Sequence, residues 1–369
     1  MCTRIFPLSQ PPGHNPPPRL HLKFPAGLDR VFTAYIGVQL HSTSLDNTQR
    51  HENYLEQPTT RIKEWLVNPE FAPVSTEQFQ LLDDATTHQL SPTQNINISD
   101  IPPEARSAIH SIIWVCYWTN ETKYKTSLST LNLPKIYHNL DPPAKPHIGL
   151  WTEYFASDTI IYPVWHGYPE HTQRTMSTRD TGVQHETEFP DLQETRPTGT
   201  KTTTQSLGRH ITGTNTQNMV HIRSGQFWGN CNKEEANAYL HTLEPKLRTG
   251  LSYLWNAPEE NRSSGVRYLQ NININPAPTS SGNPFQQTKE SCVTAFFRNM
   301  ADLEKWAARH PSHLAIWAGA IKHGKKFGDE RRFRTWHEVS VLSGGEARFE
   351  YVNCVAGTGV SEGMMVLDV

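Results

Sequence analysis

The second half of the chain carries the clearest alternation of apolar and polar positions. Runs rich in β-branched and aromatic residues predict strands, and apolar residues spaced three and four apart predict helices. Pro245 is expected to kink or split a helix that the pattern predicts over 234–255. The strands are expected over 219–228, 265–274, 291–299, 332–342 and 347–355, and the helices over 234–255 and 300–322. This β-α-β-β-α-β order with one further strand is typical of the ferredoxin-like fold.

The first half shows a weaker pattern of the same kind. Strands are expected over 30–40 and 148–155, and the apolar run 107–118 predicts another strand or a short helix. A polar helical segment is expected to end near residues 62–66. The loop-forming composition of two other segments predicts a loop and a long surface insertion; they span 67–105 and 178–214.

Together these patterns predict an α+β protein, with tandem ferredoxin-like units that form a β-sheet or barrel flanked by helices. Residues 1–28 are rich in proline and are expected to form an extended arm. A diverged first half with long loops is expected over 29–216, and a second half over 217–369. We expect the two halves to form one compact unit.

Composition and charge narrow the class of protein. The net charge of −2 indicates neither a nucleic acid nor an anionic membrane as the main partner. The five cysteines form no CxxC or CxxCH motif, which argues against a disulfide framework, structural zinc and covalently attached haem. The chain has no apolar run long enough to span a bilayer, and its N-terminus has no signal-like run, so we expect a cytoplasmic protein.

Candidate chemistry begins in the segment HPSHLAIWAG, residues 310–319. Pro311 disfavours a helical conformation at His310 and suits the first turn of a new helix, which places His313 in that turn. The partial positive charge of a helix N-terminus favours neutral imidazole, the form that binds a metal. An apolar face is expected beside this histidine, formed by Leu314, Trp317 and Ile321.

A second histidine, His337, lies in the strand expected over 332–342 and shares a face with Val339 and Val341. A buried imidazole at that position needs a polar partner. HExxH, GxGxxG and P-loop motifs are absent from the sequence. By residue type alone, His313 and His337 are more often packed core or capping histidines than ligands, and both interpretations stay open at this point.

Six short segments occur in the order seen in one known family. They are FTAYIGVQ (32–39), LWTEYF (150–155), HIRSGQ (221–226), HPSHLAIW (310–317), WHEVSVL (336–342) and FEYVNC (349–354). With them the chain resembles the haem-containing aldoxime dehydratases, the phenylacetaldoxime dehydratase family. The resemblance implies a non-covalently bound haem b, ferrous in the active state, in a homodimer of ferredoxin-like folds. It also implies a lyase that converts an aldoxime, R–CH=N–OH, into a nitrile, with the oxime nitrogen bound to ferrous iron.

The resemblance implies a role for each matched residue. His313 would be the proximal iron ligand, and His337 would be the acid and base that protonates the leaving hydroxyl and then removes the proton from carbon. Ser224 would hydrogen-bond the oxime hydroxyl. These three assignments rest on the motifs HPSH, WHEV and IRSGQ.

Other positions are less sharply matched by the same resemblance. The distal arginine of the family corresponds to Arg179, and Arg174 is a rival for that role. Glu153 is a candidate carboxylate on the distal side, and His310 is an alternative proximal ligand. The polar stretch KHGKKFGDERR (322–332) is expected to be a loop insertion.

Two other classes of function are compatible with the residues. One is a peroxidase-like haem protein on the same fold, and the other is a non-catalytic interaction protein whose histidines belong to the core.

Overall fold

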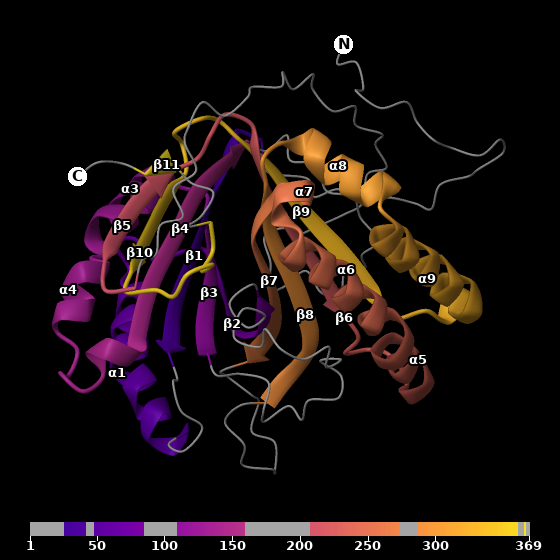
Figure 1. Ribbon diagram of the computed structural model, residues 1–369, viewed down its shortest axis with the longest axis horizontal. Helices are drawn as coiled ribbons and strands as arrows, with labels where there is room; N and C mark the ends of the chain where they lie inside the picture. Colours follow the sequence, from indigo (N-terminus) through magenta and orange to yellow (C-terminus); the bar gives the residue numbers. More distant parts are fainter. Residues whose placement is uncertain are drawn as a thin grey trace.

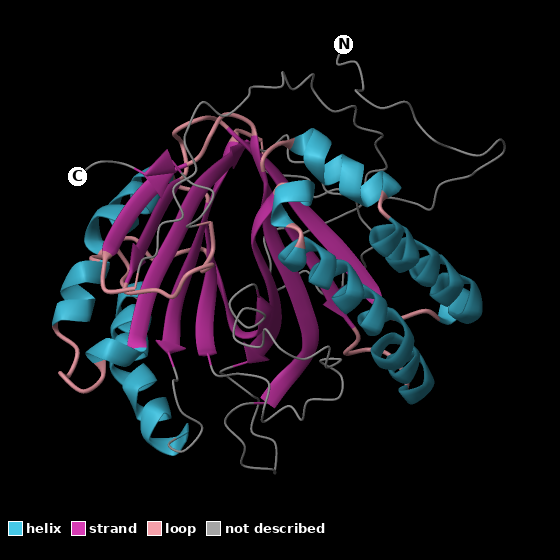
Figure 2. Ribbon diagram, in the orientation of Figure 1, coloured by secondary structure: helices cyan, strands magenta, loops and turns pink. Residues whose placement is uncertain are grey.

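The computed structural model describes residues 26–41, 48–84, 109–158, 207–273, 286–360 and 365–366. These residues form a mixed structure of helices and one large antiparallel sheet (Figures 1 and 2). The strands are β1 (Arg30–His41), β2 (Ser75–Asp84), β3 (Ile109–Trp118), β4 (Ile148–Asp158), β5 (His210–Thr214), β6 (Met219–Phe227), β7 (Ser263–Asn273), β8 (Gln286–Phe297), β9 (Arg334–Leu342), β10 (Arg348–Val352) and β11 (Met365–Val366).

The helices lie on the outer sides of this sheet (Figure 2). Those of the first half are α1 (Thr48–Leu66), α3 (Glu121–Thr130) and α4 (Leu133–His138). Those of the second half are α5 (Lys233–Ala238), α6 (Glu244–Asn256), α7 (Pro258–Asn261), α8 (Met300–Arg309) and α9 (Pro311–Phe327). In the part of the chain described by the structure, no helix is long and apolar enough to cross a membrane.

The two halves of the sheet have the same strand order. The full order is β11-β5-β10-β4-β1-β3-β2-β7-β8-β6-β9. Among β1–β4, the strands β1 and β3 are central, and β2 and β4 lie outside them. Among β6–β9, the strands β6 and β8 are central, and β7 and β9 lie outside them. Pairing of β2 with β7 joins the halves, and β4 also contacts β9, where the Ser157 hydroxyl donates to Ser340 Oγ at 2.7 Å. The sheet therefore curves until its two halves face each other.

A glycine–tryptophan pair recurs at equivalent places in the two halves. Gly37 on β1 lies opposite Trp151 on β4, and Gly225 on β6 lies opposite Trp336 on β9. A Cβ atom built on either glycine would come within 2.0 Å of the tryptophan ring in the first case and 1.9 Å in the second. Each glycine is therefore required so that an indole can lie flat across the neighbouring strand.

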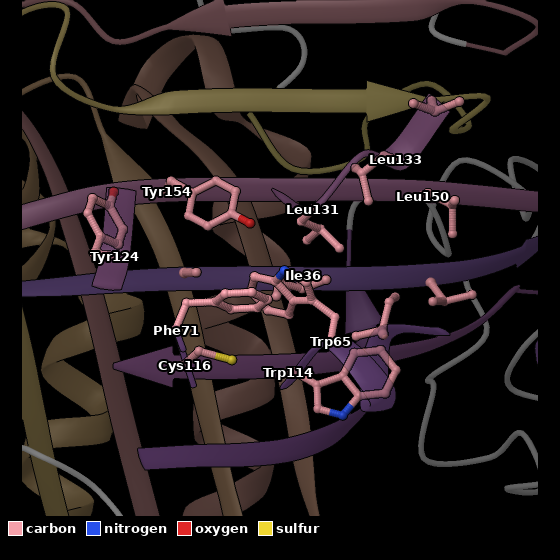
Figure 3. Packing of buried hydrophobic residues seen from close by; sticks show 14 of the residues in the cluster. Ile36, Trp65, Phe71, Trp114, Cys116, Tyr124, Leu131, Leu133, Leu150 and Tyr154 are labelled. Carbon is pink, nitrogen blue, oxygen red and sulfur yellow. The ribbon is translucent and has the colours of Figure 1, made fainter. Parts of the chain in front are cut away.

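Three of the apolar clusters hold these layers together. One fills the space between the two facing halves of the curved sheet and includes Trp151 and Trp336. A second packs the first half of the sheet against α1, α3 and α4 around Ile36 and Trp114 (Figure 3). The third packs the second half against α6, α8 and α9 around Val339. Both faces of the central strands are thus buried, which explains the unbroken burial of β1 from Val31 onward.

Most of the expected elements of the second half are confirmed. The helix expected over 234–255 is split as Pro245 predicted, because a π-helical turn over Tyr239–Leu243 separates α5 from α6. The prediction of a loop from residue 322 onward is wrong, since α9 continues to Phe327. Lys325 and Lys326 lie in its last turn, where positive charge is stabilised by the helix dipole.

The first half required larger corrections. β2 lies within the expected loop 67–105, and β5 lies at the end of the expected insertion. β2 was missed because it carries Glu77 and Gln78, which are buried despite their polarity. Within the run 107–118, residues Ile109–Trp118 form a strand and not a helix. Most of the arm over 1–28 and most of the insertion lie outside the described residues.

Candidate functional site

The N-terminus of α9 is fixed by His310 and Pro311. His310 has extended backbone angles and caps the helix, with Nδ1 accepting from the Ser312 N–H at 3.3 Å. The Ser312 hydroxyl lies 2.7 Å from the same Nδ1. The imidazole of His310 also stacks on the Tyr253 ring, with ring centroids 3.7 Å apart. His310 therefore has a complete structural role as the cap of α9.

His313 lies in the first turn of α9, as predicted from Pro311. Its ring packs edge-on against Trp306 at 4.7 Å between centroids. Its Nδ1 is buried and has no hydrogen-bond partner among the described residues. The pKa of His313 is lowered to about 4, mainly by burial and also by the nearby His337, while a hydrogen bond with the Ala307 backbone opposes the shift. The imidazole is thus neutral at neutral pH, which is the form that ligates a metal.

Ser224 and His337 lie directly opposite each other on neighbouring strands. They are register partners where β6 pairs with β9. Directly opposed side chains of an antiparallel pair have Cβ atoms about 4.5–5.5 Å apart. Both share the sheet face of Val339, which packs under α6, α8 and α9. Ile316 of α9 packs against the apolar cluster that contains Val339, so this face lies beneath α9. His337 also contributes to the lowered pKa of His313.

The structure therefore brings together three of the four residues predicted for the site. His313 comes from a helix, and Ser224 and His337 come from strands far from each other in the sequence. The fourth, Arg179, lies outside the described residues, as does its rival Arg174.

Glu153 lies on the other face of the sheet. It belongs to the same face of β4 as Trp151, which is in the interior cluster together with Trp336. His337 follows Trp336 on β9 and so points the opposite way. Arg267 Nη1 and Nη2 donate to the two carboxylate oxygens of Glu153 at 2.8 and 2.6 Å, so this carboxylate is in a closed, buried ion pair.

A second buried ion pair lies behind the site in the same interior. Arg223 Nη2 donates to Glu77 at 2.7 Å, and Arg223 Nη1 donates to the Tyr117 hydroxyl at 2.6 Å. Tyr117 in turn donates to Glu338 at 2.7 Å. Arg223 and Glu338 alternate with Ser224 and His337 along β6 and β9, so this network fixes the two strands from their far face.

Gln226 is a residue of the site that sequence reasoning did not single out. It shares the face of Ser224, two residues along β6, and its Nε2 donates to the Ser224 carbonyl at 3.0 Å. The only signal in the sequence was this spacing of two within HIRSGQ. Its partner Ser291 comes from β8, so the sequence pattern could not reveal the contact.

The surface beside His313 is apolar and exposed. Leu314 is 41% exposed and Trp317 is 55% exposed, so the apolar face expected beside His313 is not packed into the core. Ile316, on another side of α9, packs instead toward Gly250 of α6.

These features fit a haem. No group of three or more His, Cys, Asp or Glu side chains in the described part of the chain could hold a metal ion. A porphyrin brings four nitrogen ligands of its own and requires only one or two from the protein. His313 supplies a neutral imidazole with a buried, unpartnered nitrogen, and Leu314 and Trp317 supply apolar surface beside it.

The fold agrees with comparisons to known proteins. Residues 34–160 and 171–360 match the family of haem-containing dehydratases, and the chain belongs to that family. A phenylacetaldoxime dehydratase from Bacillus sp. (strain OxB-1) is 24% identical over 314 residues, covering 76% of this chain and 84% of that protein.

Two further similarities come from a relative and a solved structure. An aliphatic aldoxime dehydratase from Rhodococcus globerulus is 30% identical over 156 residues, which are 42% of this chain and 40% of that protein. A crystal structure of an aldoxime dehydratase in complex with butyraldoxime has a TM-score of 0.72 at 20% identity, covering 98% of this chain and 93% of that one. The structural likeness shows a shared fold.

Proposed function

We propose that this protein is a haem-dependent lyase that dehydrates aldoximes to nitriles. One observation carries the proposal: Ser224 and His337 oppose each other on a sheet face close to the neutral imidazole of His313. That arrangement provides a ligand for a haem iron and two polar groups to act on a molecule bound beside it. The family relationship supports the same reaction, because relatives of this chain are named aldoxime dehydratases.

His313 would hold the haem, which we take to be haem b. When bound in its ferrous state, the haem would supply an iron able to bind the oxime nitrogen and to donate electron density to it. The buried, neutral imidazole of His313 suits this role, and the engagement of His310 as a helix cap supports His313 over His310 as the ligand.

His337 and Ser224 would handle the proton and the hydroxyl of the oxime. Hydroxide is a poor leaving group, so His337 in its protonated form gives a proton to the oxime oxygen as the N–O bond breaks. The same imidazole, now neutral, takes the proton from carbon, and the products are the nitrile and water. Ser224 donates a hydrogen bond to the oxime oxygen and keeps it oriented toward His337.

The distal arginine is proposed to be Arg179, with Arg174 as the alternative. Its guanidinium would hold the hydrogen-bond network around His337 during the two proton transfers. Replacing each arginine in turn by glutamine is expected to lower kcat for the true residue and leave the other variant close to the parent enzyme.

The finer features of the fold and its setting are proposed here as well. We propose that residues 29–216 and 217–369 are tandem ferredoxin-like units, supported by their shared strand order and their glycine–tryptophan pairs. A homodimer in the cytoplasm is proposed from the resemblance and the sequence. Analytical ultracentrifugation of the purified protein tests the dimer, and a single species at the monomer mass would exclude it.

The absorption spectrum of purified protein tests the proposed function. A Soret band is expected that shifts upon reduction with dithionite and again when phenylacetaldoxime is added, with phenylacetonitrile formed as the product. A protein that consumes hydrogen peroxide but not the aldoxime would instead be a peroxidase-like haem protein. Absence of a Soret band after reconstitution with haem would favour a non-catalytic protein.

A matched pair of variants tests the iron ligand. His313→Ala is expected to yield protein that has lost haem, whereas His310→Ala is expected to retain haem with a lower thermal midpoint, because it removes only the cap and the Tyr253 stack. The reverse pattern would assign the iron to His310.

A further inference from the structure

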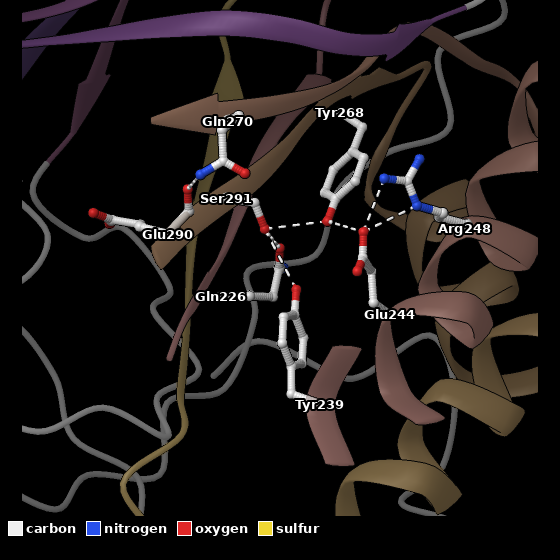
Figure 4. Close-up of polar contacts among 8 residues, drawn as sticks. All are labelled: Gln226, Tyr239, Glu244, Arg248, Tyr268, Gln270, Glu290 and Ser291. Carbon is white, nitrogen blue, oxygen red and sulfur yellow. Dashed lines mark hydrogen bonds and ion pairs between the residues drawn. The ribbon is translucent and has the colours of Figure 1, made fainter. Parts of the chain in front are cut away.

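A buried chain of hydrogen bonds runs from α6 to the back of the site (Figure 4). Its outer end is the ion pair of Arg248 with Glu244, whose N–O distances are 3.0 and 2.8 Å. The Tyr268 hydroxyl lies 3.2 Å from Glu244 Oε1 and 3.3 Å from Ser291 Oγ. Ser291 then donates to Gln226 Oε1 at 3.1 Å.

The direction of the last bonds is fixed by chemistry. The carbonyl of Ser224 can only accept, so the group of Gln226 that faces it at 3.0 Å must be the NH₂ group. The amide oxygen of Gln226 consequently faces Ser291, whose hydroxyl must donate to it. Ser291 then accepts from a tyrosine, and Tyr239 is also in reach at 3.5 Å. This order determines which way round the Gln226 amide lies.

The orientation of the Gln226 amide also determines whether the Ser224 hydroxyl accepts from Gln226 or donates to it. Gln226 Nε2 also lies 3.4 Å from Ser224 Oγ, a longer contact in which the nitrogen is the donor. Because Ser224 Oγ accepts on that side, its own proton is free to point away from Gln226. A reversed amide would offer an oxygen there and would draw the Ser224 proton back toward the sheet.

Because its surroundings are buried, the Gln226 amide keeps one orientation. Gln226 is 5% exposed, Ser291 is fully buried, and Tyr239 and Tyr268 are each 1% exposed. Water cannot substitute for a missing partner in such a place, so a reversed amide would leave polar groups unpaired.

From this geometry we infer that Gln226 is a positioning residue that makes the Ser224 hydroxyl a hydrogen-bond donor toward the bound oxime. The inference rests on the proposed function, since the oxime oxygen is the group that would accept from Ser224. Gln226 itself does not touch the substrate. Its effect should therefore appear in kcat and depend entirely on the presence of the Ser224 hydroxyl.

A double-mutant cycle tests this dependence. Gln226→Met in the haem-loaded enzyme is expected to lower kcat for phenylacetaldoxime about 10-fold, the value of one well-placed hydrogen bond, with little change in KM. In a Ser224→Ala background the same change is expected to alter kcat by less than about twofold. Equal losses in both backgrounds would overturn the inference.

Gln270 provides the matched control. Gln270 lies on the face of β7 that carries Tyr268 and is 7% exposed. Its Nε2 donates to the Glu290 carbonyl at 2.7 Å (Figure 4). Gln270→Met thus removes a comparable buried bond that does not reach Ser224. Thermal midpoints of the Gln226 and Gln270 variants should fall alike, while kcat falls only for Gln226. An equal fall in kcat for both would also overturn the inference.

Gln226→Glu gives a pH signature that a structural defect would not produce. A protonated glutamic acid can still donate to Ser224 and accept from Ser291, whereas its carboxylate can only accept. Burial raises the pKa of such a carboxyl, so kcat relative to the parent enzyme should fall as pH rises through that pKa. A ratio that stays flat with pH, in a variant that binds oxime normally by spectral titration, would refute the donor role.

The outcomes separate the two levels of the proposal. A parent protein that binds haem but forms no nitrile would overturn the proposed function and this inference together. An active parent whose Gln226→Met and Gln270→Met variants are equally active would leave the function standing and remove Gln226 from it.

Discussion

Replacing Arg267 by methionine should destabilise this protein more than any change at its surface. Arg267 makes hydrogen bonds of 2.8 and 2.6 Å to Glu153, and the exposed fractions of the two side chains are 3% and 0%. The variant would keep the bond from Tyr351 to Glu153, at 2.7 Å, but would leave the carboxylate without a counter-ion. A broken buried pair costs about 3–5 kcal/mol of the free energy of unfolding.

The assay is equilibrium unfolding in urea, with the exposed pair of Arg262 and Glu259 as the matched control. That pair has an N–O distance of 3.1 Å and exposed fractions of 41% and 72%, so Arg262→Met should cost less than about 1 kcal/mol. The double variant Glu153→Leu with Arg267→Met should recover much of the loss, because no charge stays buried alone.

Haem binding gives a second check on the same variants. Glu153 lies on the sheet face opposite His337, so Arg267→Met that is still folded should keep its Soret band. A cost below about 1 kcal/mol for Arg267→Met would refute the view that this pair is a buried structural element. Loss of haem from folded Arg267→Met would show that the interior face takes part in the site.

Three further changes have expected outcomes. Gly225→Ala should cost about 1–3 kcal/mol in urea unfolding, because its Cβ would collide with Trp336, and an unchanged midpoint would contradict this. Gly324→Ala, in α9 with no atom within 4 Å of a new Cβ, should stabilise by about 1 kcal/mol. His41 has a folded pKa lowered by burial to about 4 from its usual 6.5, so stability should fall as pH drops from 6.5 to 4, by roughly 3 kcal/mol. In His41→Gln this acid-side slope should be smaller, and an unchanged slope would count against it.

The elements that could be predicted from the sequence are those whose burial is local. Strands such as 30–40 show their pattern because they are mostly apolar and are buried on both faces. The start of α9 is signalled by Pro311 alone. β2 was not predictable from local sequence. Glu77 can be buried there because Arg223, 146 residues later in the chain, donates a hydrogen bond to its carboxylate.

The site shows the same limit. The helical position of His313 followed from local rules, but the opposition of Ser224 and His337 depends on the register of two strands that no local pattern specifies. That both residues belong to one site was expected only through the family resemblance. Gln226 was missed because its role depends on Ser291, which becomes its neighbour only when β6 and β8 pair.

The repeated glycine–tryptophan pair gives this chain an internal reference for its own site. In the second half, the residue before the glycine and the residue after the tryptophan are Ser224 and His337. The equivalent residues of the first half are Ile36 and Thr152, which also face each other across paired strands. Both are buried, and Ile36 is packed among the apolar side chains beneath the first-half helices. The same framework therefore holds buried core side chains in one half and Ser224 with His337 in the other, so the fold itself does not dictate which residues occupy these two positions.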